Sequence, residues 1–155
     1  MQTVVTFLPL AGLAAAFVAV FAIVTRRKPD NTAYKYAVGL ALAAAFVIIW
    51  VNLAVGVIGE PDNPANLMYF GVLAVGGIGA ALARFEPPGM ARALSATAGA
   101  QALVGLATLI AGLGPRVGVI VLNGFFLALL AASALLFRRA APEVRRGRGR
   151  GGSRR

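Results

Sequence analysis

The sequence contains no cysteine and no histidine among its 155 residues. Their absence excludes disulfide bonds, thiol chemistry, imidazole acid–base catalysis and the usual side-chain ligation of zinc or haem. Charged residues are also scarce, at 13% of the chain, compared with roughly a quarter in an average soluble protein. Apolar residues make up 59%, and the mean hydropathy is +0.82. This composition predicts a membrane protein without a cofactor or metal.

Long apolar runs without internal charge account for most of the chain. A bilayer core about 30 Å thick requires roughly 20 apolar residues in a helix. The first run could be a signal peptide, but no basic residue precedes it and the basic segment Arg26-Arg27-Lys28 follows it, so we interpret it as a retained span. The sequence therefore predicts an all-α integral membrane protein with five transmembrane helices, at residues 3–25, 33–58, 64–85, 90–113 and 115–137.

The distribution of lysine and arginine predicts the orientation. Fourteen of the 15 basic residues lie in or at the edges of the first and third connections or in the tail from Arg138, whereas Arg116 stands alone on the opposite side. Because basic loops favour the cytoplasm, we expect the N-terminus outside and the C-terminus in the cytoplasm. A four-span arrangement would place two basic segments on opposite sides. The short connections predict an up-and-down bundle.

Proline and glycine mark the expected helix ends. Pro64 and Pro115 suit the first position of a helix, and Asn63 and Gly114 precede them as plausible caps. The segment Glu86-Pro87-Pro88-Gly89 is expected to break the chain between the third and fourth helices.

Small residues at helical spacing predict where helices pack in lipid. The pattern predicts tight packing between the third and fourth spans and a central place for the third. The alternative to simple packing is that the glycines among these small residues form a hinge or line a substrate path. The small residues expected to carry the packing are Gly71, Ala74, Gly77, Ala81, Ser95 and Gly99.

Three amides lie within the apolar runs, at Asn52, Gln101 and Asn123. Counted from the outer ends at 1.5 Å per residue, Asn52 and Asn123 both lie roughly 9 to 12 Å below the outer boundary, so they are expected to be able to meet. One interpretation is a polar pocket open to the outside and covered by the loop residues Glu60, Asp62, Asn63 and Asn66. The other is hydrogen bonding between helices. Gln101 is expected near mid-membrane, facing protein.

The basic segments are expected to contact anionic lipid headgroups on the cytoplasmic side. Residues 138–155 hold eight arginines and almost nothing apolar, which predicts a disordered tail. An RNA-binding segment and a docking arm for an acidic partner are alternatives, but nucleic acid is disfavoured because no aromatic residues are interleaved. The expected headgroup contacts are Arg26, Arg27, Lys28, Arg138, Arg139, Arg145 and Arg146.

One segment resembles a known group of proteins. The run NPANLMYFGVLAVGGIGAALARFEPPGMARAL, residues 63–94, is similar to a segment of small uncharacterised multi-pass inner-membrane proteins of proteobacteria. It covers about a fifth of the chain. No activity is assigned to that group, so the resemblance implies a bacterial inner membrane and adds no catalytic or binding residue.

Three functions compete. The favoured one is a structural or accessory component that contacts another membrane protein, lipid, or further copies of itself. A transporter or channel subunit would use a path along Asn52, Gln101 and Asn123, although the spans lack the buried charged residue that coupled transporters commonly carry. An enzyme would use Glu60 and Asp62 as acid and base, but no nucleophile or metal-ligand set accompanies them. We therefore expect a protein that is not an enzyme.

Overall fold

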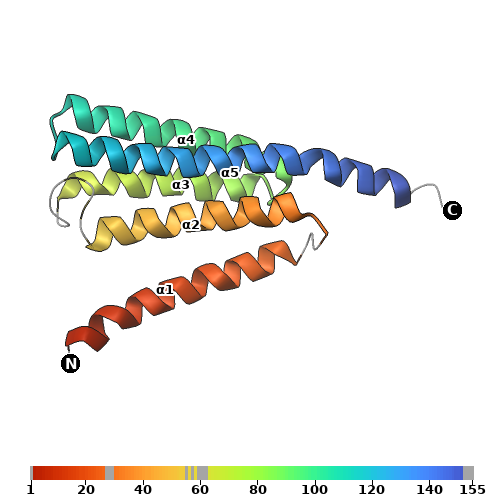
Figure 1. The fold of residues 1–155 in the computed structure, drawn as a ribbon, viewed down its shortest axis with the longest axis horizontal. Coiled ribbons are helices and arrows are strands. Elements are labelled where there is room, and N and C mark those ends of the chain that lie inside the picture. The colour runs from red at the N-terminus through yellow and green to blue at the C-terminus, as the bar shows by residue number, and fades with distance from the viewer. Residues whose placement is uncertain (1, 27–29, 55, 57, 59–62, 152–155) are drawn as a thin grey trace.

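The structure is a computed structural model that describes residues 2–26, 30–54, 56, 58 and 63–151, with side chains between 11 and 141. This part of the chain is helical and contains no strand. It therefore confirms the all-helical class and the five long helices (Figure 1). The elements are α1 (Gln2–Thr25), α2 (Thr32–Ala54), the short 3-10 helix η1 (Pro64–Asn66), α3 (Leu67–Leu82), α4 (Pro87–Ile110) and α5 (Arg116–Gly151).

Four segments of the described chain are long and apolar enough to cross a membrane. They cover 32–54, 64–82, 87–110 and 116–141. The described apolar part of α1, Ala11–Thr25, is shorter. By length and composition, four of the five expected spans are present, and the first stays a prediction.

Helix α5, rather than α3, makes the most extensive contacts with other helices. It packs against α4 and α2, α4 also packs against α3, and α1 packs chiefly against α2. Figure 1 shows α1 diverging from α2 toward its N-terminus. The expected central place of the third span is therefore wrong. Small residues permit close approach, but large side chains of α5, such as Phe126 and Phe137, fill the space between helices.

One end of the bundle gathers three parts of the chain that lie far apart in sequence. The Tyr34 hydroxyl donates a hydrogen bond to the Phe85 carbonyl oxygen at 2.9 Å. The Asn31 side-chain amide donates to the Ala140 carbonyl oxygen at 3.1 Å. The start of α2, the α3–α4 turn and α5 near Ala140 thus meet. We call this the basic end, because Arg26, Arg84, Arg92 and Arg138 lie on these segments or directly beside them.

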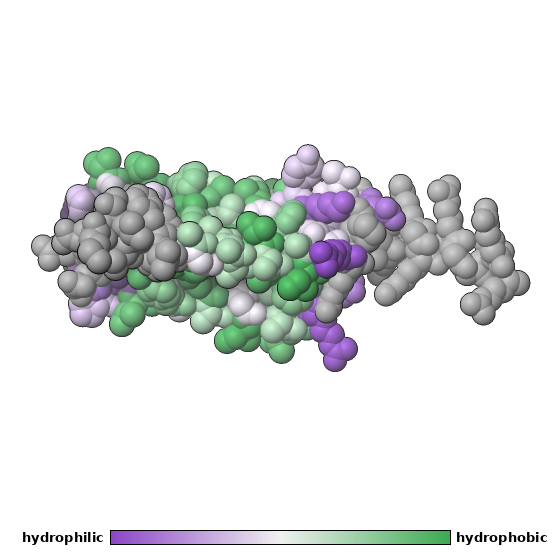
Figure 2. All heavy atoms as spheres, turned by 90° about the horizontal axis from the view of Figure 1, so that it is seen from below, coloured by the Kyte–Doolittle hydropathy of each residue, from purple (hydrophilic) through white to green (hydrophobic). Residues whose placement is uncertain are grey.

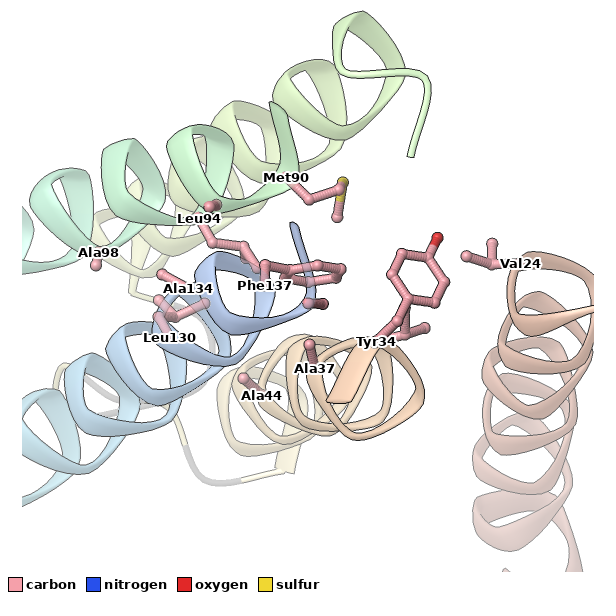
Figure 3. Packing of buried hydrophobic residues seen from close by; sticks show 13 residues of the cluster. Val24, Tyr34, Ala37, Ala44, Met90, Leu94, Ala98, Leu130, Ala134 and Phe137 are labelled. Atoms are coloured by element: carbon pink, nitrogen blue, oxygen red, sulfur yellow. The ribbon is translucent and has the colours of Figure 1, made fainter. Parts of the chain in front are cut away.

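The larger hydrophobic cluster lies at the basic end. The rings of Tyr34 and Phe137 pack edge to face, with centroids 5.5 Å apart and planes at 78°. Figure 3 shows Phe137 between Met90 and Leu94 of α4 and Tyr34 of α2. This cluster joins α2, α4 and α5. A smaller cluster of Ile48, Ile58, Tyr69 and Phe126 lies toward the opposite end.

Several helix ends differ from the predicted boundaries, and two of them have a clear local cause. Helix α2 ends at Ala54, four residues before the predicted end, and Gly56 with φ +75° donates its N–H to the Val51 carbonyl oxygen at 2.9 Å. A glycine in the left-handed region commonly ends a helix in this way. Helix α4 begins at Pro87, since proline without an N–H suits the first turn. The expected helix breaker therefore starts the helix.

The turn between α3 and α4 is formed by two non-glycine residues with left-handed backbone, Arg84 (φ 50°) and Phe85 (φ 58°). Such a conformation costs roughly 1–2 kcal/mol per residue. The bond from Tyr34 to the Phe85 carbonyl and the bond from the Phe85 N–H to the Ala80 carbonyl, at 3.3 Å, hold the turn. The tertiary fold thus supports a turn that the local sequence disfavours.

The C-terminal segment differs from the predicted disorder. Helix α5 continues through Gly151 without interruption. Adding a residue to an existing helix avoids the cost of nucleation. Arg138 and Arg139 are exposed, while the side chains of Arg145 and Arg146 lie outside the described residues.

The predicted packing of α3 on α4 is confirmed, but it uses a different stripe. Cβ atoms built at Gly76 and Gly79 would lie 3.3 Å from Thr97 Oγ1 and 2.8 Å from Ala93 Cβ, so these glycines permit the close approach. Ser95 is half-buried and donates to the Ala91 carbonyl of its own helix. The remaining residues predicted to pack are exposed instead, namely Gly71, Ala74, Gly77, Ala81 and Gly99.

Candidate functional site

A buried cluster of polar side chains joins α3, α4 and α5. The Gln101 side-chain N–H donates to Asn123 Oδ1 at 2.8 Å. The Tyr69 hydroxyl lies 3.2 Å from Asn123 Oδ1 and 3.0 Å from Asn123 Nδ2. Tyr69 and Gln101 are fully buried, and Asn123 is 8% exposed. Asn123 therefore connects all three helices.

The residues that α4 contributes to the cluster lie on one face of that helix. Gln101, Gly105 and Thr108 are four and three residues apart, which places them on the same side of a helix. A Cβ built at Gly105 would lie 2.9 Å from Asn123 Oδ1, so only glycine leaves room for the amide. The Thr108 hydroxyl is fully buried, donates to the Val104 carbonyl at 2.7 Å and lies beside Tyr69.

The hydrogen-bonding capacity of the cluster is nearly used up. Asn123 Nδ2 also donates to the Val119 carbonyl of its own helix at 2.8 Å. Among the described atoms of the cluster, Gln101 Oε1 is buried without a partner, which costs about 1–3 kcal/mol. This arrangement of neutral amides and a hydroxyl can fasten three helices together.

Asn52 and Asn123, which were expected to be able to meet, each form hydrogen bonds with other partners. Asn52 Nδ2 donates to the Ile48 carbonyl of its own helix at 2.7 Å, and its Oδ1 is buried without a partner. The prediction compared depths counted from expected helix ends, and α2 ends only two residues after Asn52. Equal depth also says nothing about the direction in which each side chain points.

The outer loop residues have local roles where the structure describes them. Asn63 Oδ1 accepts from the Ala65 N–H at 3.0 Å, which confirms its predicted capping role. Asn66 is buried, and its Oδ1 accepts from the Ile58 N–H at 2.9 Å. Asn66 thus fastens the segment after α2 to η1. Glu60 and Asp62, predicted to cover the pocket, lie outside the described residues.

The described residues that were predicted for one pocket form separate hydrogen bonds. Asn123 contacts Gln101 and Tyr69, Asn66 contacts Ile58, and Asn52 bonds within α2. Neither Tyr69 nor Thr108 was predicted to belong to this cluster. The signal for Thr108 was its spacing of seven residues from Gln101, and that for Tyr69 was a hydroxyl needing a partner in an apolar helix.

Charged groups gather apart from this cluster, at the basic end. Figure 2 shows the strongly hydrophilic residues at the end from which α5 projects, beside a hydrophobic band along the bundle. Arg26, Arg84 and Arg92 are exposed there, and exposed Arg138 lies 3.5 Å from Ser95 Oγ. Arg27 and Lys28, predicted to contact headgroups, lie outside the described residues.

The described chain offers no cluster of three or more histidine, cysteine, aspartate or glutamate side chains that could hold a metal ion. The candidate site is thus a set of neutral amides and hydroxyls between helices. In comparisons with known proteins, no family profile, curated protein or solved structure matches the chain.

Proposed function

We propose that the protein is a multi-pass membrane protein with five spans, acting as a structural or accessory component that contacts other membrane proteins or lipids. The observation that supports this proposal most directly is that Gln101 and Tyr69 both form hydrogen bonds with Asn123 inside the bundle. Polar groups that are paired in this way stabilise helix contacts. They leave an apolar outer surface for contacts with the surroundings.

The outer surface supports this function. In a soluble protein so many exposed apolar side chains would be costly, whereas lipid or a neighbouring helix can cover them. The exposed glycines Gly71, Gly77 and Gly99 also allow another helix to approach closely. The large exposed apolar residues include Leu67, Ile78, Leu82, Leu103, Ile110, Val117, Ile120 and Val121.

The proposed location is a bacterial inner membrane, with the basic end in the cytoplasm and the N-terminus outside. The support is the contrast between Arg26, Arg84, Arg92 and Arg138 at the basic end and Arg116 at the opposite end. Anionic headgroups would surround the basic end. Nucleic acid is not a proposed partner.

The transporter alternative is less well supported. It requires Asn52, Gln101 and Asn123 along one path, yet Asn52 bonds within α2 and the other two amides bond directly to each other. A polar path would need these groups free to exchange partners with a solute.

Topology and partners can be tested separately. Because the chain has no cysteine, single variants such as Arg26→Cys and Arg116→Cys can be labelled in intact cells with a membrane-impermeant maleimide. We expect labelling at position 116 only, and labelling at position 26 contradicts the orientation. Extraction in nanodiscs should retain a reproducible membrane-protein or lipid partner, and recovery of the chain in the soluble fraction would contradict the proposed function.

A further inference from the structure

An apolar cavity of about 300 Å³ lies between α1, α2 and α3, in the half of the bundle near the basic end. Val20 and Val24 line it from α1, and Gly77 and Ala80 line it from α3. Phe85 of the α3–α4 turn also faces it. Residues from α2, α4 and α5 complete the lining. Most of the lining residues come from the parts of these helices that run toward the basic end, and Ile49 and Leu73 extend the cavity toward the opposite end.

Water is a poor occupant of this cavity. A buried water needs two to four polar partners. Among the described lining residues, Thr97 is the one with a polar side chain, and its hydroxyl already donates to the Ala93 carbonyl oxygen at 2.8 Å. Apolar cavities of about 150 Å³ stay dry and accept apolar ligands, and this cavity is about twice as large. The lining therefore selects a hydrocarbon.

The cavity opens toward the side of the bundle. Helix α1 packs chiefly against α2, while α3 packs against α4, so α1 and α3 do not close over the space between them. Val20 is 42% exposed on one wall and Gly77 is exposed on the other. A Cβ built at Gly77 would meet nothing within 4 Å. A lipid chain can therefore enter from the surrounding bilayer.

Positive charge stands at the basic end of both walls. Arg26 follows the lining residue Val24 by two positions, and Arg84 directly precedes the lining residue Phe85. Both arginines are exposed. The acidic residues described on the neighbouring connections are Asp30 and Glu86. In the chain, Asp30 follows Arg26 and Glu86 follows Arg84. Exposed arginines thus stand within two residues of the cavity lining on α1 and at the α3–α4 turn.

We propose that this cavity binds an acyl chain of an anionic phospholipid from the leaflet at the basic end, with the headgroup phosphate against Arg26 and Arg84. A helix of a partner protein is about 10 Å wide, and a cavity of about 300 Å³ holds a chain rather than a helix. This inference rests on the proposed membrane insertion and adds a specific lipid to it.

The test is phospholipid retention measured by native mass spectrometry. Protein purified from vesicles containing equal amounts of phosphatidylglycerol and phosphatidylcholine is washed with detergent, and the bound lipid is identified. We expect one retained phosphatidylglycerol per chain. Gly77→Phe places a ring in the cavity mouth and should reduce retention at least tenfold. The matched control is Gly71→Phe, since Gly71 is also exposed on α3, has open space and does not line the cavity.

Equal retention by wild type, Gly77→Phe and Gly71→Phe would overturn the proposal. Loss of a copurifying protein from Gly77→Phe, with lipid retention unchanged, would overturn it in favour of a protein partner. If Gly77→Phe does not fold, alkylation of Gly77→Cys provides the same test. It should be slow with phosphatidylglycerol bound and at least tenfold faster after delipidation, and an unchanged rate would contradict the proposal. Gly71→Cys should react at one rate throughout.

The headgroup contact has its own variants. Arg26→Gln combined with Arg84→Asn removes both charges, and asparagine tolerates the left-handed backbone at position 84. We expect the preference for phosphatidylglycerol over phosphatidylcholine to fall at least threefold. Arg116→Gln, at the opposite end, should leave it unchanged. An undiminished preference in the double variant would overturn the headgroup assignment.

The outcomes separate this inference from the proposed function. If the chain resists carbonate extraction from membranes but retains no lipid, the lipid site fails and the membrane function stands. If the chain is extracted as a soluble protein, both fail.

Discussion

The pairing of the amides in the bundle gives the sharpest prediction. The structure pairs Asn123 with Gln101 at 2.8 Å and with the Tyr69 hydroxyl at 3.0–3.2 Å, whereas Asn52 bonds to Ile48 in its own helix. Asn123→Ala removes contacts with two other helices. At about 0.6 kcal/mol for a typical interhelical bond and up to about 1.7 for a strong one, the loss is about 1–3 kcal/mol of unfolding free energy.

A double-mutant cycle isolates the pairs. Gln101→Ala with Asn123→Ala should show a coupling of about 0.6–1.7 kcal/mol. Asn52→Ala with Asn123→Ala should be additive within about 0.3–0.5 kcal/mol, the ordinary scatter for independent sites. The assay is reversible unfolding in mixed detergent micelles, followed by circular dichroism. Coupling that is larger for Asn52 than for Gln101 would refute the arrangement of α2, α4 and α5 described above.

Two further predictions use the same assay. Gly79→Ala places a Cβ 2.8 Å from Ala93 Cβ and should destabilise the bundle by about 1–3 kcal/mol. At the control position, the Cβ of Gly77→Ala meets nothing within 4 Å, so the stability should stay within about 0.5 kcal/mol of wild type or rise slightly from better helix propensity. Similar losses of stability at both positions would contradict the packing of α3 on α4. Tyr34→Phe keeps the ring but deletes the hydrogen bond to the Phe85 carbonyl. We expect the free energy of unfolding to fall by about 0.5–1.5 kcal/mol and amide hydrogen exchange in the 83–86 turn to become faster. Unchanged exchange in this turn would show that the bond does not hold it.

The polar cluster and the lipid cavity occupy different parts of the bundle. Gln101 and Asn123 bond between α4 and α5, while Val20 and Gly77 line the opening between α1 and α3. Substitutions at one place should therefore leave the other unchanged. Asn123→Ala should retain phosphatidylglycerol as wild type does, and Gly77→Phe should preserve the coupling of Gln101 and Asn123.

The sequence alone determined that these segments form helices, and it determined some of the residues at which they begin. Runs of about 20 residues without internal charge leave a backbone few alternatives to helix in lipid. Asn63 caps the turn at Pro64 because its side-chain oxygen can reach the Ala65 N–H without help from distant residues. These features depend on neighbours along the chain, so composition and spacing predict them.

The tertiary structure alone decided which faces meet. The exposed residues Gly71 and Gly77 and the packed residues Gly76 and Gly79 lie on one helix, and each residue turns the face by about 100° at 3.6 residues per turn. Small-residue spacing cannot choose between such stripes. The choice depends on the side chains opposite, here Ala93 and Thr97 of α4.

The same reason governs the amides. Asn52 and Asn123 had similar predicted depths, but a hydrogen bond also requires two helices to be adjacent and rotated toward each other. Helix α5 turns Asn123 toward Gln101, and Gly105 provides the room for it. Depth follows from counting residues along one helix, whereas rotation follows from the packing of all of them together.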